Sequence, residues 1–136
     1  MKRSIRFRIF CAAAVCAALS LAGWIPAASA ADPISGLWKE VSTPKHENSY
    51  VVFSQDAGML FVTCYWEFEG TPIVWHGVGS AWGNQVEYAY KSTRIRSGWD
   101  PIGKHELTLS ADGKTLSGTW KNTRGESGPL KFIRIK

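Results

Sequence analysis

Apolar and polar residues alternate after residue 31 in short runs that favour β-strands. The alternation has a period of two and is rich in β-branched and aromatic residues, and no stretch keeps apolar residues at the i, i+3, i+4 and i+7 positions of an amphipathic helix. The predicted strands cover residues 36–42, 49–55, 59–69, 73–82, 85–95, 103–111, 114–122 and 129–136. The sequence therefore predicts an all-β fold, an eight-stranded antiparallel up-and-down meander.

The edges of this meander favour a closed sheet. An open sheet exposes two unpaired edge strands, and pairing the first strand with the last removes both edges. We therefore expect a small barrel, with a two-sheet sandwich as the alternative.

Two short turns predict which residues face each other. Asp112-Gly113 is a strong signal for a two-residue type I′ hairpin turn, and Gly83-Asn84 suits a type II′ turn. The pairs predicted to share the inner face are Leu109 with Leu116, Leu107 with Gly118, His105 with Trp120, Gly79 with Tyr88, and Gly77 with Tyr90. His76 and Lys91 are predicted to pair on the outer face.

A third turn determines the register between the second and third strands. If residues 56–58 form a three-residue loop with a left-handed Gly58, Tyr50 lies opposite Cys64 and Val52 lies opposite Val62. The predicted inner face then contains Tyr50, Val52, Val62, Cys64, Trp66, Phe68, Tyr88, Tyr90, His105, Leu107, Leu109 and Trp120.

The N-terminus has the pattern of an export signal. Four bases precede residue 9, an uncharged apolar run covers residues 9–25, and Ala28-Ser29-Ala30 forms a small-x-small cleavage site. We expect a signal peptide over residues 1–30, one barrel domain over residues 31–136, and a periplasmic or secreted product. Membrane contact is expected only if the leader stays uncleaved.

Removing the leader changes both charge and cysteine content. Four of the 16 Lys and Arg residues leave and all 11 acids stay, so the charge falls from +5 to +1 and nucleic acid is not an expected partner. Cys64 becomes the only cysteine, which excludes an internal disulfide. We expect a buried, inert thiol, with an intermolecular disulfide or a nucleophile as alternatives.

The two ends of the domain carry a family resemblance. Gly36-Leu37-Trp38 opens the first strand, and Arg134 lies in the last strand on the same face as Leu130 and Phe132. This resembles the calycin superfamily of lipocalin and avidin-like proteins. The resemblance implies that Trp38 lies at the barrel floor with the Arg134 side chain across its indole ring.

The predicted inner face favours a ligand cavity. It mixes large rings with polar ends, and each polar end needs a partner if it is buried. Trp66, Phe68, Tyr88, Tyr90 and Trp120 would line the cavity, and His105 would orient a polar group of the ligand. Gly77, Gly79 and Gly118 also remove bulk beside the rings, which favours open space. The alternative is a solid core, in which glycines opposite tyrosines simply pack well.

A basic segment between the fifth and sixth strands is a second candidate site. Lys91, Arg94, Arg96 and Lys104 surround Trp99, and at a barrel mouth they would bind an anionic head group, a glycan or an envelope protein. Mutual neutralisation with the acidic first half of the domain is the alternative explanation.

No residue constellation typical of catalysis is visible. Glu67 and Glu69 are predicted to face solvent, and His46, His76 and His105 are not predicted to share a metal, so no cofactor is expected. We expect a non-enzymatic binding module for a small apolar or aromatic molecule. A protein-interaction or inhibitor module with a solid core is the alternative, and a hydrolase or isomerase is the third choice.

Overall fold

The structure is a computed structural model that describes residues 33–43, 46–93 and 97–136. The predicted signal peptide and the bases Arg94 and Arg96 lie outside the described residues. No helix long and apolar enough to cross a membrane occurs in the part of the chain that is described.

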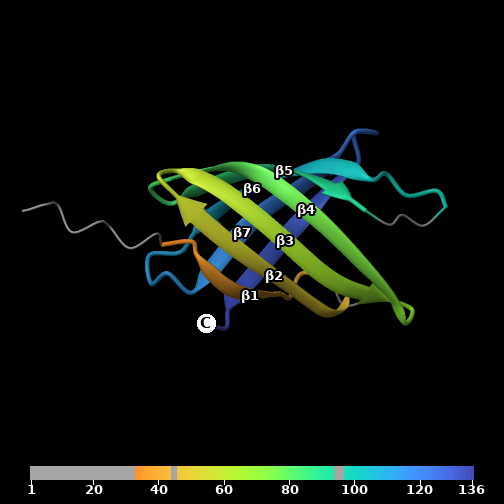
Figure 1. Cartoon of the computed structure of the whole chain (residues 1–136), viewed down its shortest axis with the longest axis horizontal. Helices are drawn as coiled ribbons and strands as arrows, with labels where there is room; N and C mark the ends of the chain where they lie inside the picture. Colours follow the sequence, from red (N-terminus) through yellow and green to blue (C-terminus); the bar gives the residue numbers. More distant parts are fainter. Residues whose placement is uncertain (1–32, 44–45, 94–96) are drawn as a thin grey trace, which may run out of the picture.

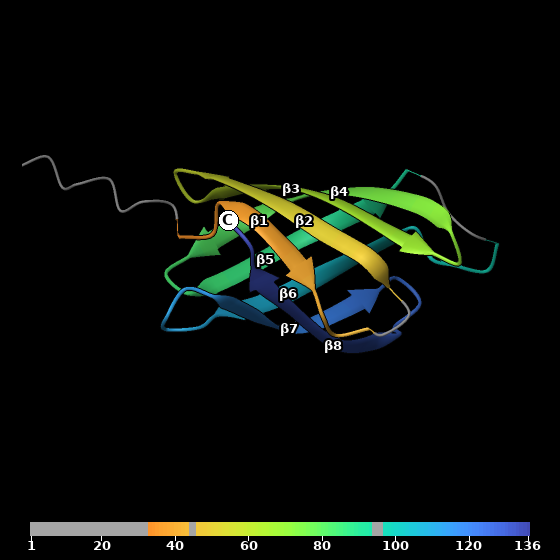
Figure 2. The same ribbon diagram turned by 90° about the horizontal axis from the view of Figure 1, so that it is seen from below.

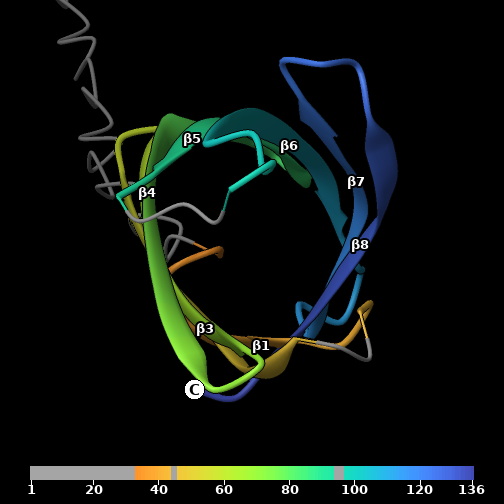
Figure 3. The same cartoon turned by 90° about the vertical axis from the view of Figure 1, so that its right-hand side faces the viewer.

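Eight antiparallel strands form one closed barrel in chain order, and β1 pairs with β8 (Figures 1 and 3). The strands are β1 Gly36–Glu40, β2 Glu47–Asp56, β3 Met59–Phe68, β4 Thr71–Trp82, β5 Gln85–Ser92, β6 Ile102–Leu109, β7 Thr115–Asn122 and β8 Ser127–Arg134. The predicted fold class and strand order are confirmed, and the sandwich alternative is excluded.

The β6–β7 hairpin has the predicted register but a different turn. Leu109 pairs with Leu116 and His105 with Trp120, as predicted. Only Gly113 of the predicted type I′ pair has a positive φ, 69°, and the backbone N–H of Gly113 donates to the Ser110 carbonyl at 2.9 Å. The hydroxyl of Ser110 donates to the Asp112 carboxylate at 2.6 Å and stabilises this wider loop. The predicted type I′ turn is therefore wrong, whereas the pairing is confirmed.

The β4–β5 hairpin agrees with its prediction. Gly83 has a φ of 59°, Trp82 pairs with Gln85, and Tyr88 lies opposite Gly79. A Cβ atom at Gly79 would collide with the backbone of the adjacent strand at the Glu87 carbonyl. Glycine therefore allows close approach of β4 and β5 here and does not create space for a ligand.

The predicted register of β2 is wrong by one residue. The turn contains only Ala57 and Gly58, with φ values of 47° and 84°, because Ala57 also adopts the left-handed conformation. Since side chains alternate along a strand, this shift moves residues 50–55 of β2 to the face opposite the predicted one.

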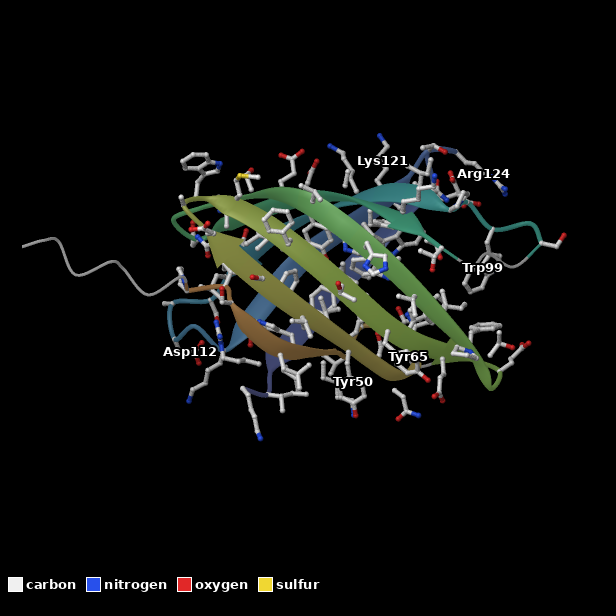
Figure 4. All side chains as sticks on the ribbon, in the orientation of Figure 1. Tyr50, Tyr65, Trp99, Asp112, Lys121 and Arg124 are labelled. Atoms are coloured by element: carbon white, nitrogen blue, oxygen red, sulfur yellow. The ribbon has the colours of Figure 1, made fainter. Side chains whose placement is uncertain are left out.

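Val51 and Phe53 are the inward residues, opposite Cys64 and Val62. Tyr50 and Val52 face outward instead of inward, and Figure 4 shows Tyr50 and Tyr65 pointing away from the barrel.

One half of the barrel interior is packed solid. Phe53 makes edge contacts with Trp38, Tyr88 and Phe132, with ring centroids 5.7–6.1 Å apart. The Trp38 indole is fully buried and donates to the Ile34 carbonyl at 3.0 Å.

The Arg134 guanidinium carbon lies 4.3 Å from the centroid of the Trp38 ring, so the predicted floor contact is present. Its nitrogens also donate to the carbonyls of Ser35 and Gly113, both at 2.8 Å. These bonds close the end of the barrel that carries Asp112 in Figure 4.

Candidate ligand-binding site

The opposite half of the barrel contains a cavity of about 470 Å³. This end carries the β1–β2, β3–β4, β5–β6 and β7–β8 connections, toward the right of Figures 1 and 2. Its aromatic walls are Trp66 of β3, Trp75 of β4, Tyr90 of β5, Trp99 of the β5–β6 connection and Trp120 of β7. Strand alternation directs the four strand residues inward, and the β5–β6 connection adds Trp99 from outside the sheet.

Trp66 and Trp99 stack at the mouth of the cavity, and the His46 ring contacts Trp66 at an angle of 41°. Trp66 and Trp99 lie parallel, with centroids 5.4 Å apart and planes 10° apart. The imidazole of His46 lies on Trp66 with centroids 4.1 Å apart. Phe68 makes an edge-to-face contact with Trp99, with ring centroids 5.0 Å apart. The connection that carries Trp99 is therefore tied to β3 by aromatic contact.

His105 lies deep in the cavity wall and bonds to a buried phenol. His105 Nδ1 lies 2.6 Å from Tyr88 Oη, and this is the only hydrogen-bond partner of Tyr88 Oη among the described residues. A buried phenol must donate its proton to an acceptor. Tyr88 therefore donates to Nδ1, which assigns the proton of the neutral imidazole to Nε2.

Burial keeps this imidazole neutral. Burial lowers the pKa of His105 to about 3 and outweighs the opposing effect of the Glu40 charge. Burial also raises the pKa of Tyr88 well above its usual value. Both groups therefore keep the protonation state described above throughout the physiological range.

Several N–H groups of the cavity have no acceptor among the described residues. Among the described residues, His105 Nε2 and the indole nitrogens of Trp66 and Trp75 have no hydrogen-bond partner. Every fully enclosed side-chain nitrogen or oxygen in this part of the chain has a partner, so these three nitrogens are reachable by solvent. Since His105, Trp66 and Trp75 line the cavity and are buried, their free N–H groups face the cavity space. A ligand with a hydrogen-bond acceptor would satisfy them.

A buried carboxylate, Glu40, forms a second polar feature of the wall. Ser42 and Ser49 donate their hydroxyls to its two oxygens at 2.9 Å, and His46 Nδ1 lies 3.0 Å from Oε2. Burial raises the pKa of Glu40, but these hydrogen bonds and the charge of His46 outweigh burial and bring the pKa below its usual value. Glu40 is therefore ionised at neutral pH.

The sequence prediction did not include Glu40, Trp75, His46 or Trp99 in the ligand site. Glu40 lies two residues after Trp38 on the same strand, so simple alternation from the predicted floor residue would have placed it inside. His46 lies at the end of a loop, where alternation gives no information.

The predicted ligand-binding residues divide into three groups. Trp66, Tyr90, His105 and Trp120 line the cavity. Tyr88 lies behind His105 and supports it without reaching the cavity space. Phe68 lies beside Trp66 and Trp99 rather than in the lining.

The predicted anion or partner loop does not come together as one surface in the described residues. Trp99 turns toward Trp66, whereas Lys91 and Lys104 lie exposed on the outside of the sheet. Lys104 pairs there with Glu106 and lies 3.9 Å from Glu87.

Cys64 is buried in the barrel, and burial, followed by the negative charge of Glu40, raises the pKa of its thiol well above the usual value. This supports the predicted inert thiol rather than a nucleophile. Within residues 33–43, 46–93 and 97–136, no group of three or more His, Cys, Asp or Glu side chains is arranged to hold a metal ion.

No family model matches this sequence. A search of curated proteins gives no match either. The chemistry of the cavity itself is therefore the basis for inferring its ligand.

Proposed function

We propose that this protein is an exported, non-enzymatic binding module that holds a small apolar or aromatic molecule in the open half of its barrel. The resemblance of the Gly36-Leu37-Trp38 strand and Arg134 to the lipocalin and avidin-like proteins supports this proposal. The leader pattern supports export.

The observation that carries the proposal is an aromatic cavity whose walls carry N–H groups that have no acceptor among the described residues. Cavities of about 300–1,000 Å³ with apolar walls and a few oriented polar groups are typical of small-molecule sites. An apolar cavity of about 150 Å³ accepts benzene, so the volume of about 470 Å³ suits a molecule of roughly two or three rings.

The ligand would carry a hydrogen-bond acceptor on an apolar body. Its acceptor would bond to Nε2–H of His105, and its rings would pack against Trp75, Tyr90 and Trp120. Tyr88 would act as a positioning residue, because its hydroxyl fixes the tautomer of His105.

A titration with 2-acetylnaphthalene, a two-ring ketone, tests this site. Calorimetry should detect one molecule bound per chain. His105→Leu should weaken binding about tenfold, because an apolar side chain leaves the ketone oxygen without its donor. His76→Leu is the matched control, since His76 is exposed on the outside of β4, and it should leave the affinity unchanged.

Native mass spectrometry of protein recovered from the producing cells adds a second measurement. It should show a chain beginning near residue 31 and a retained small molecule. The proposal fails if the protein carries nothing and if fatty acids, tetrapyrroles and one- to three-ring aromatics all leave its tryptophan emission unchanged.

A further inference from the structure

The described part of the cavity wall carries several acidic side chains. Of the charged side chains that line it, Glu40, Asp100 and Glu126 are carboxylates, and no Lys or Arg among the described residues belongs to the lining. Asp100 comes from the β5–β6 connection and Glu126 from the β7–β8 turn, so both lie at the mouth.

The two mouth carboxylates are held in place by neighbouring groups. The hydroxyl of Thr123 and the backbone N–H groups of Ile102 and Arg124 donate to Asp100 and lower its pKa, with the Thr123 hydroxyl as the largest cause. The Asn122 amide donates to one oxygen of Glu126. The other Glu126 oxygen has no hydrogen-bond partner among the described residues.

The nearby described cations are used elsewhere. The Arg124 guanidinium donates to the Gly98 carbonyl at 2.7 Å and lies outside the cavity lining, at the same end of the barrel as Trp99 in Figure 4. Lys121 points away from the barrel in the same view. Protonated His46 would offset one carboxylate, Glu40, to which it is bonded. Asp100 and Glu126 have no ion-pair partner among the residues that the structure describes.

The aromatic walls of the cavity, like its carboxylates, favour a positively charged ligand. The faces of indole and phenol rings carry negative electrostatic potential and attract ammonium groups, most strongly for tryptophan. The cavity has four Trp residues and one Tyr in its walls. Carboxylates and electron-rich rings together favour a positive charge and disfavour a negative one.

We infer that the ligand is an organic cation, an aromatic or alkyl amine or quaternary ammonium compound. Its charged group would lie at the mouth near Asp100 and Glu126, and its body would extend inward toward His105. This inference rests on the proposed function and names the ligand class of the same site. It is opposite in sign to the anionic partner that the basic segment around Trp99 suggests from sequence.

Three probes with the same two-ring body test the inference. They are trimethyl(2-naphthylmethyl)ammonium, 2-naphthylmethanol and 2-naphthylacetate, which are cationic, neutral and anionic. In calorimetric titrations of the mature protein, we expect the ammonium compound to bind about tenfold more tightly than the alcohol. The acetate should bind more weakly than the alcohol.

A pair of variants separates the mouth from the general charge of the protein. Glu126→Gln should reduce the preference for the ammonium compound at least about threefold, because it removes an unpaired charge at the mouth. Glu87→Gln removes an exposed carboxylate from the outer face of β5 and should leave that preference unchanged.

The outcomes distinguish this inference from the proposed function. Equal or tighter binding of the alcohol or the acetate would overturn the cationic ligand class and leave a binding module. Failure of all three probes while 2-acetylnaphthalene binds would overturn the cationic class as well. Failure of every probe, including that ketone, would overturn the proposed function.

Discussion

At the residue scale, the site depends on the protonation of one imidazole. The alternation of β6 predicts that His105 faces inward, and the structure confirms this position. Its bond to Tyr88 depends on how β5 and β6 pair, because Tyr88 lies opposite His105. This pairing cannot be derived from the alternation of β6 alone. The carboxylate Glu40 also depends on relative placement, because its partners are Ser42 and His46 of the β1–β2 connection and Ser49 of β2.

The neutral state of His105 makes stability depend on pH. The pKa of His105 is about 3 in the folded protein, below the value of 6.5 expected in the unfolded chain. The unfolded chain therefore binds an extra proton between these values. The stabilising contribution is complete above pH 6.5 and is lost as the pH falls.

Urea unfolding at pH 7.0 and pH 5.0 measures this effect. The free energy of unfolding of the wild type should fall by about 2 kcal/mol more than that of His105→Gln, which cannot titrate at this position. Equal losses in the two proteins would show that His105 is not held neutral by burial.

At the element scale, the turns decide how much of the sheet is predictable. The Gly83 turn and the loop at Asp112 both give the correct register, although the second has a different geometry. At residues 57–58 the prediction reserves the left-handed conformation for glycine, and Ala57 adopts it as well. This one-residue difference in loop length reverses the faces of β2. The prediction therefore misses Phe53 as a core residue, although its ring lies at the centre of the packed half.

Two adjacent valines test the register of β2 directly. Val51 is fully buried against β3, whereas Val52 faces solvent. Val51→Ala should lower the free energy of unfolding by about 2 kcal/mol, because it removes two buried methyl groups and leaves a void. Val52→Ala, the same change on the outer face, should alter it by no more than about 0.5 kcal/mol. A larger loss for Val52→Ala in denaturant unfolding would restore the register in which Tyr50 and Val52 face inward.

At the scale of the whole molecule, the barrel is divided into a packed half and an open half. The floor half, around Trp38, Phe53 and Phe132, gives stability without disulfides. The alternation of apolar residues predicts the strands, and the need to pair the two edge strands predicts the closed shape. The cavity is less predictable, because its volume depends on how side chains from seven strands and three connections fit together. Glycines such as Gly79, which suggested space from sequence, instead allow dense packing.

The tryptophans form a natural set of probes for this division. Trp66, Trp75, Trp99 and Trp120 line the cavity, Trp38 is buried in the floor half with its N–H bonded to Ile34, and Trp82 is 69% exposed outside the barrel. A ligand in the cavity therefore has four reporters, and two tryptophans serve as internal controls.

The most direct measurement is an NMR titration of the mature protein, labelled with ¹⁵N at tryptophan, with 2-acetylnaphthalene. Single Trp→Phe variants assign the indole N–H signals. The signals of the four cavity tryptophans should shift together and saturate at one molecule per chain, while those of Trp38 and Trp82 stay in place. Shifts confined to Trp82, or no shift in the four cavity signals at saturating ketone, would contradict a ligand site inside the barrel.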